Sequence, residues 1–232
     1  MKRFTVGLIS LVLLVCVAGY LYVESVWNPS MTATLTSKVH AISAKHGGYV
    51  PLADIPKFLQ LALIATEDQN FYHNMGFDVE GIARAVIADV SAGKLVQGAS
   101  TITEQLVKDI FLTDQKSISR KIKQIAIAIM LTQRMSKNEI LGLYLNEVYF
   151  GHGAYGVGDA AKVYFHRSVT NLTPAQCALI AGLPQAPKGY DPLLHPQLAK
   201  QRQLEVLQRM VSVGDISKAR SETIAKAPLG FP

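Results

Sequence analysis

The amino-terminal segment from Phe4 to Val23 contains no charged residue, and this run constrains the chain more than any other feature. A helix of this length spans roughly 30 Å, which matches the hydrocarbon core of a bilayer. Lys2 and Arg3 precede the run. Because positive residues favour the cytoplasmic side, we expect the rest of the chain to lie outside. Residues 1–27 are therefore predicted to form a cytoplasmic stub and a single-pass transmembrane anchor.

Two other interpretations of this segment remain open. One is a buried core helix, although such uniform apolarity is unusual in a core. The other is a cleaved signal peptide, since Ala18 and Gly19 are small residues near a suitable position. The run is longer than a usual signal core, which favours the uncleaved anchor. Cys16 would then lie in lipid and Cys177 outside, and two such cysteines make neither a disulfide framework nor a cysteine-based zinc site.

The rest of the chain is predicted to fold as one mainly α domain. Residues 28–48 are polar with weak periodicity, and we interpret them as a stalk or a short edge strand. Residues 49–232 show helical periodicity and helix-start signals almost throughout. These signals include an apolar stripe from Val79 to Val90, a start at Ser100 or Thr101, a Ser136–Glu139 capping box, Pro174 and Pro196. The segment IAIAIML, residues 125–131, is apolar all round and is predicted to be the buried central helix.

A carboxylate ends the first apolar helix of this domain. Glu67 follows the sequence LALIAT, and partial desolvation there would raise its pKa towards the range of a general base. The alternative role is that of a helix-end glutamate satisfied by local hydrogen bonds. Asp68 lies about 100° further round a helix, so the two carboxylates cannot face the same point squarely.

The segment GASTITEQLVK opens the next helix but one. Small residues and the hydroxyls of Ser100 and Thr101 would expose backbone N–H groups, and a helix start of this kind is a candidate anion site. Thr101 and Glu104 also have the spacing of a capping box, which is the alternative role for Glu104. Lys108 follows Glu104 by four residues on the same helix.

A basic run contributes to the formal net charge of +6. It contains Lys116, Arg120, Lys121 and Lys123, opposite an apolar stripe. Such a run is usually a solvated face, but beside the helix start at Ser100 it could bind a phosphate or a pyrophosphate. Nucleic acid is not expected as a partner, because the run has no interleaved aromatic residues and the chain is predicted to lie outside the membrane.

Five motifs in order carry a resemblance to a known family. They are EDQNFYHNMGFD, GASTITEQLVK, RKIKQ, ILGLYLNEVYFGHGAYGVGDAAKVYF and LTPAQCALIAGLPQAPKGYDP, and with the following helix they extend from Leu61 to Met210. Together they resemble the bacterial peptidoglycan glycosyltransferases of glycosyltransferase family 51. The resemblance implies a lysozyme-like helical domain with a membrane-dipping subregion. At this length we expect the monofunctional biosynthetic type, without a transpeptidase domain.

The resemblance implies a reaction and a set of site residues. Members of this family join lipid II units into glycan strands, with inversion and release of undecaprenyl pyrophosphate. Glu67 resembles the general base acting on the acceptor 4-hydroxyl. The substrate-binding positions are Asp68, Ser100, Thr101, Gln105, Lys108, Lys116, Arg120, Lys121 and Lys123. Gln124 stands at the position of the second catalytic glutamate.

The resemblance also implies partners and a location. A divalent cation, Mg²⁺ or Mn²⁺, is expected, and no organic cofactor. The expected partners are lipid II, the nascent glycan strand, the membrane and proteins of cell-wall synthesis or cell division. The domain is expected on the outer, periplasmic face of a bacterial inner membrane.

Two positions depart from the family pattern. Family members read S-T-x-T-Q-Q, whereas this chain has Glu104 in place of the first glutamine, and they read R-K-x-x-E, whereas this chain has Gln124. An amide can hold a hydrogen bond but cannot carry charge or relay a proton. If the glutamate acts electrostatically, its loss lowers the rate by roughly 10²–10⁴-fold. Glu104 in the adjoining motif is a candidate for compensation.

The sequence therefore leaves three candidate functions to compare. The favoured one is an active single-pass transglycosylase, with a turnover lowered by Gln124. The second is an impaired homologue that binds lipid II or division proteins as a scaffold. The third is a lysozyme-like glycoside hydrolase, but hydrolysis normally uses two carboxylates across the cleaved bond, and the amide at residue 124 weakens that case.

Overall fold

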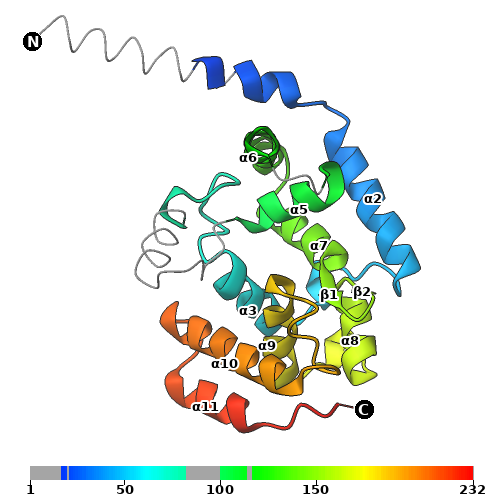
Figure 1. Cartoon of the computed structure of the whole chain (residues 1–232), viewed down its shortest axis with the longest axis vertical. Coiled ribbons are helices and arrows are strands. Elements are labelled where there is room, and N and C mark those ends of the chain that lie inside the picture. The colour runs from blue at the N-terminus through cyan, green and yellow to red at the C-terminus, as the bar shows by residue number, and fades with distance from the viewer. Residues whose placement is uncertain (1–16, 20, 82–99, 114–116, 232) are drawn as a thin grey trace, which may run out of the picture.

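The computed structural model describes residues 17–19, 21–81, 100–113 and 117–231 and is mainly helical (Figure 1). Nine helices of this part are α2 (Met31–Lys45), α3 (Lys57–Glu67), α5 (Ile102–Phe111), α6 (Ile118–Arg134), α7 (Lys137–Glu147), α8 (Val157–Phe165), α9 (Pro174–Gly182), α10 (Pro196–Ser212) and α11 (Lys218–Lys226). Short 3₁₀ turns lie at Leu52–Asp54, Val169–Asn171 and Leu183–Gln185, and β1 (Tyr149–Gly151) pairs antiparallel with β2 (Ala154–Tyr155).

Local capping explains where several of these helices begin. Thr101 and Glu104 form a reciprocal capping box at the start of α5. Ser136 with Glu139 does the same for α7, and Thr173 with Gln176 for α9. Each box satisfies two backbone donors that a helix start leaves free. The predicted starts of these three helices are confirmed.

The centre of the fold is α9 and not the IAIAIML helix. Every residue of α9 from Ala175 to Gly182 is buried. This helix packs against α3 and α10 on one side and also contacts α8 and α11 (Figure 1). Its sequence PAQCALIAG contains small residues that allow neighbouring helices to approach closely. The hydrophobic core therefore forms around a short helix that carries no charge.

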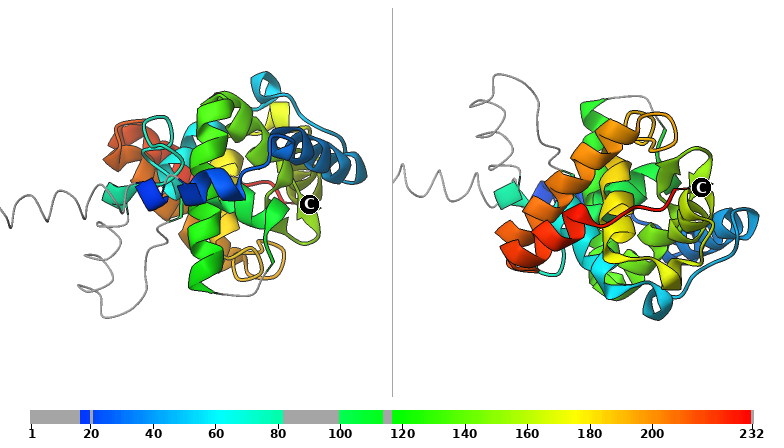
Figure 2. Two further views of the ribbon diagram at one scale, coloured as in Figure 1. Left: turned by 90° about the horizontal axis from the view of Figure 1, so that it is seen from above. Right: turned by 90° about the horizontal axis from the view of Figure 1, so that it is seen from below.

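The predicted helix at residues 125–131 is largely buried, as expected, but it is not the central helix of the fold. These residues lie in α6, which packs mainly on α5 and runs across the outside of the domain (Figure 2). Within this segment Ala126, Ile127, Ala128, Met130 and Leu131 are buried. In contrast Ile118 is 83% exposed and Ile122 is 49% exposed. The apolar periodicity located a helix, but its stripe does not mark the buried side along the whole length.

The segment interpreted as a stalk or edge strand contains a helix that packs on the domain. In α2, Leu35 and Val39 are fully buried against α5 and α7. Lys38 Nζ donates to the carbonyl of Ile110 at 3.0 Å, and Ser43 Oγ donates to the carbonyl of Asn146 at 3.1 Å. The strand interpretation is wrong for residues 31–45, because two buried side chains and two long-range bonds hold a mostly polar helix. The division of the chain at residue 49 stays a prediction.

The glycine-rich segment after α7 forms a tight hairpin connection to α8. Strands β1 and β2 pair across His152 and Gly153. Gly151 has φ 92°, and a Cβ there would lie 2.5 Å from the carbonyl oxygen of Pro187. Only glycine fits such a position without moving the backbone. The hairpin thereby holds the segment after α9 against the end of α7.

Two predicted helices fall mainly outside the described residues. The run from Phe4 to Val23 lies largely in residues 1–16, and the stripe from Val79 to Val90 lies largely in residues 82–99. Within the part of the chain that is described, no helix has both the length and the apolarity to cross a membrane. The transmembrane anchor stays a prediction.

Candidate active site

A pocket of ≈ 1020 Å³ lies between the end of α3, the start of α5, one side of α6 and the polar face of α10. It gathers side chains from Ala65 to Ser212, which are 147 positions apart in the sequence. Seven of the predicted site residues line it, namely Glu67, Asp68, Ser100, Thr101, Gln105, Lys108 and Gln124. With Pro184, Gln185 and Tyr190 also lining it, the pocket brings four of the five motifs to one place.

Glu67 is the last residue of α3, and its carboxylate is held by α5. Gln105 Nε2 donates to Glu67 Oε2 at 2.9 Å, and the hydroxyl of Tyr144 donates to Gln105 Oε1 at 3.1 Å. Burial raises the pKa of Glu67 above its ordinary value, while the Gln105 bond and the charges of Arg202 and Lys108 oppose that rise. A carboxylate of this kind is a suitable proton acceptor.

Asp68 caps the end of α3, and its carboxylate is held by hydrogen bonds within the protein. Its Oδ2 accepts the backbone N–H of Ile102 at 3.1 Å, and Asn74 Nδ2 donates to both carboxylate oxygens. Burial raises the pKa of Asp68 to about 6, against the effect of these hydrogen bonds and of Lys137. The side chain is only 5% exposed. Asp68 thus ties the start of α5 to the end of α3, beside Glu67.

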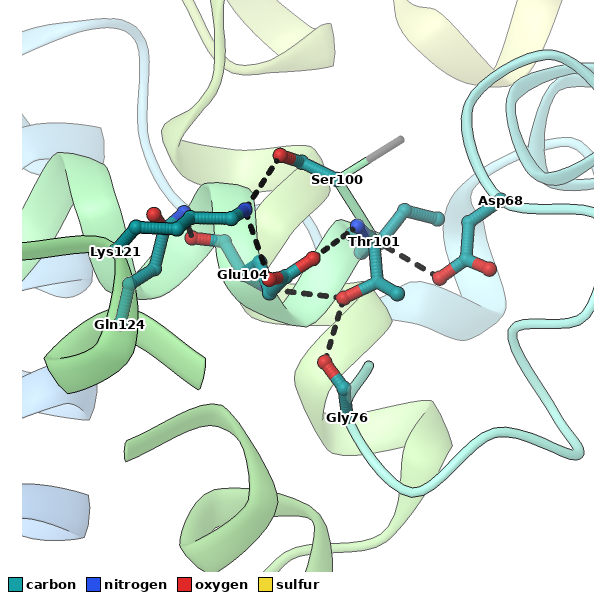
Figure 3. A network of polar contacts seen from close by, with 8 residues as sticks. Asp68, Gly76, Ser100, Thr101, Glu104, Lys121 and Gln124 are labelled. Carbon is teal, nitrogen blue, oxygen red and sulfur yellow. Dashed lines mark hydrogen bonds and ion pairs between the residues drawn. The ribbon is translucent and has the colours of Figure 1, made fainter. Parts of the chain in front are cut away.

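The start of α5 is not an open anion site, contrary to the expectation from its small residues. Glu104 Oε2 accepts the N–H of Thr101 at 2.8 Å, and the N–H of Ile102 is bound by Asp68. Thr101 Oγ1 accepts the N–H of Glu104 and donates to the carbonyl of Gly76 (Figure 3). Two protein carboxylates therefore already occupy N–H groups that an anion would need.

Glu104 is bound by two residues of α6, Lys121 at its carboxylate and Gln124 at its backbone carbonyl (Figure 3). Lys121 Nζ donates to Glu104 Oε1 at 2.9 Å and to Ser100 Oγ at 3.0 Å. Gln124 Nε2 donates to the backbone carbonyl of Glu104 at 2.6 Å. Glu104 is 1% exposed and, unlike Gln124, is not among the residues that line the pocket. Its carboxylate caps α5 and pairs with Lys121, so a direct contact with substrate is not its role.

The predicted basic set is only partly in the pocket. Lys108 lines it and forms an ion pair with Asp109 at 2.9 Å. Lys121 reaches its edge through Ser100. Lys123 is exposed on α6, and Lys116 falls outside the described residues. Arg120 has a buried Nε without a hydrogen-bond partner among the residues described.

Sequence reasoning missed the cations that α10 contributes. Arg202 and Arg209 line the pocket beside Tyr190. Arg202 is 8% exposed, and its Nε donates to the carbonyl of Gly182 at 3.1 Å while Nη1 donates to Glu205 at 2.9 Å. Arg202, Glu205 and Arg209 are spaced i, i+3 and i+7, which places them on one helix face. That spacing was the available signal.

The expected divalent cation has no ready protein site in this part of the chain. The described residues contain no group of three or more His, Cys, Asp or Glu side chains that could hold a metal ion. Gln124 supplies a neutral amide where a carboxylate was expected. Mg²⁺ is commonly held by one or two carboxylates together with substrate phosphates. The divalent cation stays a prediction, and no step below depends on it.

The helical fold thus holds a pocket in which the half-buried carboxylate of Glu67 lies with the cations Lys108, Arg202 and Arg209. The chain belongs to the transglycosylase family, because the family model described as "Transglycosylase" matches residues 34–211.

The relatives that the chain matches are longer proteins. It is 38% identical over 234 residues to penicillin-binding protein 1A of Neisseria flavescens, covering 98% of this chain and 29% of that protein. It is 38% identical over 245 residues to penicillin-binding protein 1A of Aquifex aeolicus, covering 99% and 34%. A crystal structure of penicillin-binding protein 1A from Haemophilus influenzae aligns with a TM-score of 0.48 and 27% identity, over 80% of this chain and 18% of that one. The monofunctional type expected from the sequence stays a prediction.

Proposed function

We propose that this domain is a peptidoglycan glycosyltransferase that polymerises lipid II into glycan strands and releases undecaprenyl pyrophosphate. The observation that carries the proposal is the position of Glu67 in one pocket with Lys108, Arg202 and Arg209. A proton acceptor and a set of cations are the two things that transfer from a pyrophosphate donor needs. The family and the five motifs support the same reaction.

In the proposed reaction, Glu67 acts as the general base. Its carboxylate takes the proton of the acceptor 4-hydroxyl, and that oxygen attacks the anomeric carbon of the donor. The bond from this carbon to the pyrophosphate oxygen breaks as the new glycosidic bond forms, with inversion. The electron pair leaves with the pyrophosphate. Gln105 orients the carboxylate, since its amide occupies one oxygen and leaves the other for the hydroxyl.

The cations of the pocket are proposed to stabilise the departing pyrophosphate. An arginine can bind two phosphate oxygens at once, and its planar group is best used where it is held in place. Arg202 is held by Gly182 and Glu205, with its guanidinium 5.6 Å from the ring centre of Tyr190. Lys108 and Arg209 complete the set, and Lys121 adds charge at the edge near Ser100.

We further propose that residues 1–27 anchor the chain in a bacterial inner membrane as a single pass. The uncharged run from Phe4 to Val23 and the two positive residues before it support this placement. The domain then lies on the outer, periplasmic face, where a lipid-linked donor and a growing glycan strand are both accessible. Membrane-bound division or cell-wall proteins are the proposed protein partners.

The experiment that tests the proposal uses the full chain in detergent with labelled lipid II and Mg²⁺ or Mn²⁺. A ladder of glycan polymer on a gel supports the transferase. Binding of lipid II without any product supports the scaffold alternative, in which the amide of Gln124 has ended catalysis. Shortening of added glycan strands without polymer supports the hydrolase. The transferase proposal is wrong if either of the last two results is obtained.

A further inference from the structure

Residues 68–78, here called the 68–78 loop, follow α3 directly and hold the start of α5. Asp68 Oδ2 accepts the backbone N–H of Ile102, the first residue of α5, at 3.1 Å. The same helix carries Gln105, whose amide donates to Glu67 at 2.9 Å. The orientation of Glu67 therefore depends on how firmly this loop fixes α5.

Lys137 reaches the 68–78 loop from a third helix, since it is the first residue of α7. Its Nζ donates to Asn74 Oδ1 at 2.8 Å and lies 4.7 Å from the ring centre of Phe71, which is fully buried. Burial lowers the pKa of Lys137, and the charge of Asp68 opposes that fall. Lys137 is not among the residues that line the pocket of Glu67, so a contact with substrate there is not its role.

Asn74 connects Lys137 to Asp68. Its Oδ1 accepts from Lys137 Nζ at 2.8 Å and from the backbone N–H of Gly76 at 3.0 Å. Its Nδ2 donates to Asp68 Oδ1 at 2.9 Å and to Oδ2 at 3.1 Å. Because both donors lie on the oxygen side, the amide nitrogen is directed to the carboxylate, and a cation at the oxygen strengthens the nitrogen as a donor. Lys137 thus acts on Asp68 through one amide group.

Opposing effects set the charge on Asp68. Burial raises the pKa of Asp68 to about 6, and the charge of Asp78 adds to the rise. The bonds from Ile102 and Asn74 and the positive charge of Lys137 oppose it. Without the charge of Lys137 the pKa of Asp68 would rise further, because an interaction that favours the ionised form is lost. A larger fraction of the carboxyl would then be protonated at a given pH, and its hold on the start of α5 would weaken.

We propose that Lys137 is a positioning residue for the transfer reaction. Through Asn74 it holds the carboxylate of Asp68 on the first turn of α5. That helix in turn holds Gln105 against Glu67. This inference rests on the proposed function and deepens it, and Lys137 takes no part in the chemical step.

The first measurement is the pH profile of kcat/KM for lipid II polymerisation by the full chain in detergent. Lys137→Met keeps the stem over Phe71 but removes the charge and the donor. Its kcat/KM at pH 6.5 should fall by about tenfold and return to within about threefold of the parent value at pH 8.5, where Asp68 is ionised in both proteins. Lys137→Arg keeps a cation with donors and should stay within about threefold at both pH values. Lys226→Met, at an exposed position on α11, is the matched control and should follow the parent chain.

The second measurement does not depend on activity. Urea unfolding is followed for Lys137→Met, Asp68→Asn and the double variant at pH 7.5 and pH 5. At pH 7.5 both single changes remove the same interaction, so the double variant should lose less stability than the sum of the two. At pH 5 Asp68 is largely protonated in the parent chain, so the losses should come closer to additive. Asn74→Ala removes the connection but keeps the lysine, and it should reproduce the pH profile of Lys137→Met even if that variant does not fold.

The outcomes separate this inference from the function on which it rests. If the parent chain polymerises lipid II and Lys137→Met has the parent profile, the positioning role is wrong and the transferase stands. A fall by the same factor at every pH, or additive losses of stability at pH 7.5, would also overturn it, since either result marks a lysine that only supports the fold. If the two residues are coupled at pH 7.5 but no polymer forms, the transferase is wrong and the role in transfer falls with it, whereas the link between Lys137 and Asp68 stands.

Discussion

Gln105 donates a hydrogen bond of 2.9 Å from its amide nitrogen to Glu67 Oε2, and this bond joins α5 to the end of α3. The orientation of the amide is fixed in turn by the hydroxyl of Tyr144, which donates to Gln105 Oε1 at 3.1 Å. Three helices thus determine where the Glu67 carboxylate lies. The same bond favours the ionised form of Glu67, against the burial that favours the protonated form.

Removing this bond should change the pH dependence of the reaction. In Gln105→Ala the pKa of Glu67 rises further, because an interaction with the ionised form is lost. A general base must be ionised, so the acid limb of kcat/KM moves to higher pH. Turnover at neutral pH should fall by roughly 10–100-fold as the carboxylate also loses its position. Lipid II polymerisation measured from pH 5 to 9 checks this.

Two further variants complete that measurement. Gln133→Ala is the matched control, because Gln133 is exposed on α6 and its loss should leave the profile unchanged. Tyr144→Phe should move the limb in the same direction as Gln105→Ala, by a smaller amount. A Gln105→Ala profile that coincides with that of the parent chain would contradict the role given to this bond.

The contact between Gln124 and Glu104 predicts a conflict between stability and activity. Gln124→Glu should raise turnover, since it restores the charge that the family carries at this position. However, its carboxylate cannot donate to the carbonyl of Glu104, which the amide nitrogen approaches at 2.6 Å. The free energy of unfolding should therefore fall by about 1–3 kcal/mol. Urea unfolding and initial rates per folded molecule measure the two effects.

The second half of this prediction concerns Lys121. In the double variant Glu104→Gln with Gln124→Glu, its ammonium loses its partner on α5 and can pair with residue 124 three positions along α6. Part of the lost stability should return. Gln133→Glu on the exposed side of α6 controls for an added charge. Equal stabilities for the parent chain and Gln124→Glu would show that the amide bond contributes nothing.

Glu147 should make the domain less stable as the pH rises. Burial at the end of α7 raises its pKa to about 8 in the folded chain, against an ordinary value of 4.5, so the folded state binds more protons between these two values. The free energy of unfolding then decreases from about pH 4.5 to about pH 8, on the order of 5 kcal/mol in all. Glu147→Gln removes this contribution and should be more stable than the parent chain at pH 8.

Urea unfolding at pH 4.5, 6 and 8 measures the effect of Glu147. Asp68, whose pKa is also raised, to about 6, contributes a loss of the same sign in both proteins and therefore cancels in the comparison. Glu222→Gln, at an exposed position on α11, should follow the parent chain at every pH. Parallel curves for the parent chain and Glu147→Gln would mean that the Glu147 carboxyl is not buried in solution.

Metal removal should affect turnover and not the fold. The described residues hold no cluster of metal-ligating side chains, so a chelator should leave the thermal unfolding of the substrate-free chain unchanged. If a divalent cation accompanies the pyrophosphate, the same chelator lowers polymerisation, and added Mg²⁺ or Mn²⁺ restores it. A lower unfolding temperature in chelator alone would reveal a structural metal site and contradict this view.

Much of the fold could be predicted because its signals are local. The capping boxes at Thr101, Ser136 and Thr173 act within four residues, so the sequence pattern was sufficient to place those helix starts. The polar helix α2 had no such signal, because only a few of its side chains are buried and its partners are on α5 and α7. Its packing depends on residues that are far away in the sequence.

Only the site residues that lie within the sequence motifs were predicted. Glu67, Gln105 and Lys108 come together as the motifs indicated. The arginines of α10 were missed: their spacing marks one face of a helix, but nothing near Arg202 reveals that α10 packs beside α3. The anion site at the start of α5 failed for a related reason. Its N–H groups are bound by Asp68 and Glu104, and the first of these comes from another part of the chain.

The most direct test of the account is the lipid II polymerisation rate of Glu67→Gln in the full chain. The amide has the size of the carboxylate but cannot accept the proton of the acceptor hydroxyl, so polymer should fall to the background level. Glu222→Gln should polymerise at the parent rate, and thermal unfolding should show that both variants are folded. Polymer made by Glu67→Gln at the parent rate would contradict the assignment of Glu67 as the base.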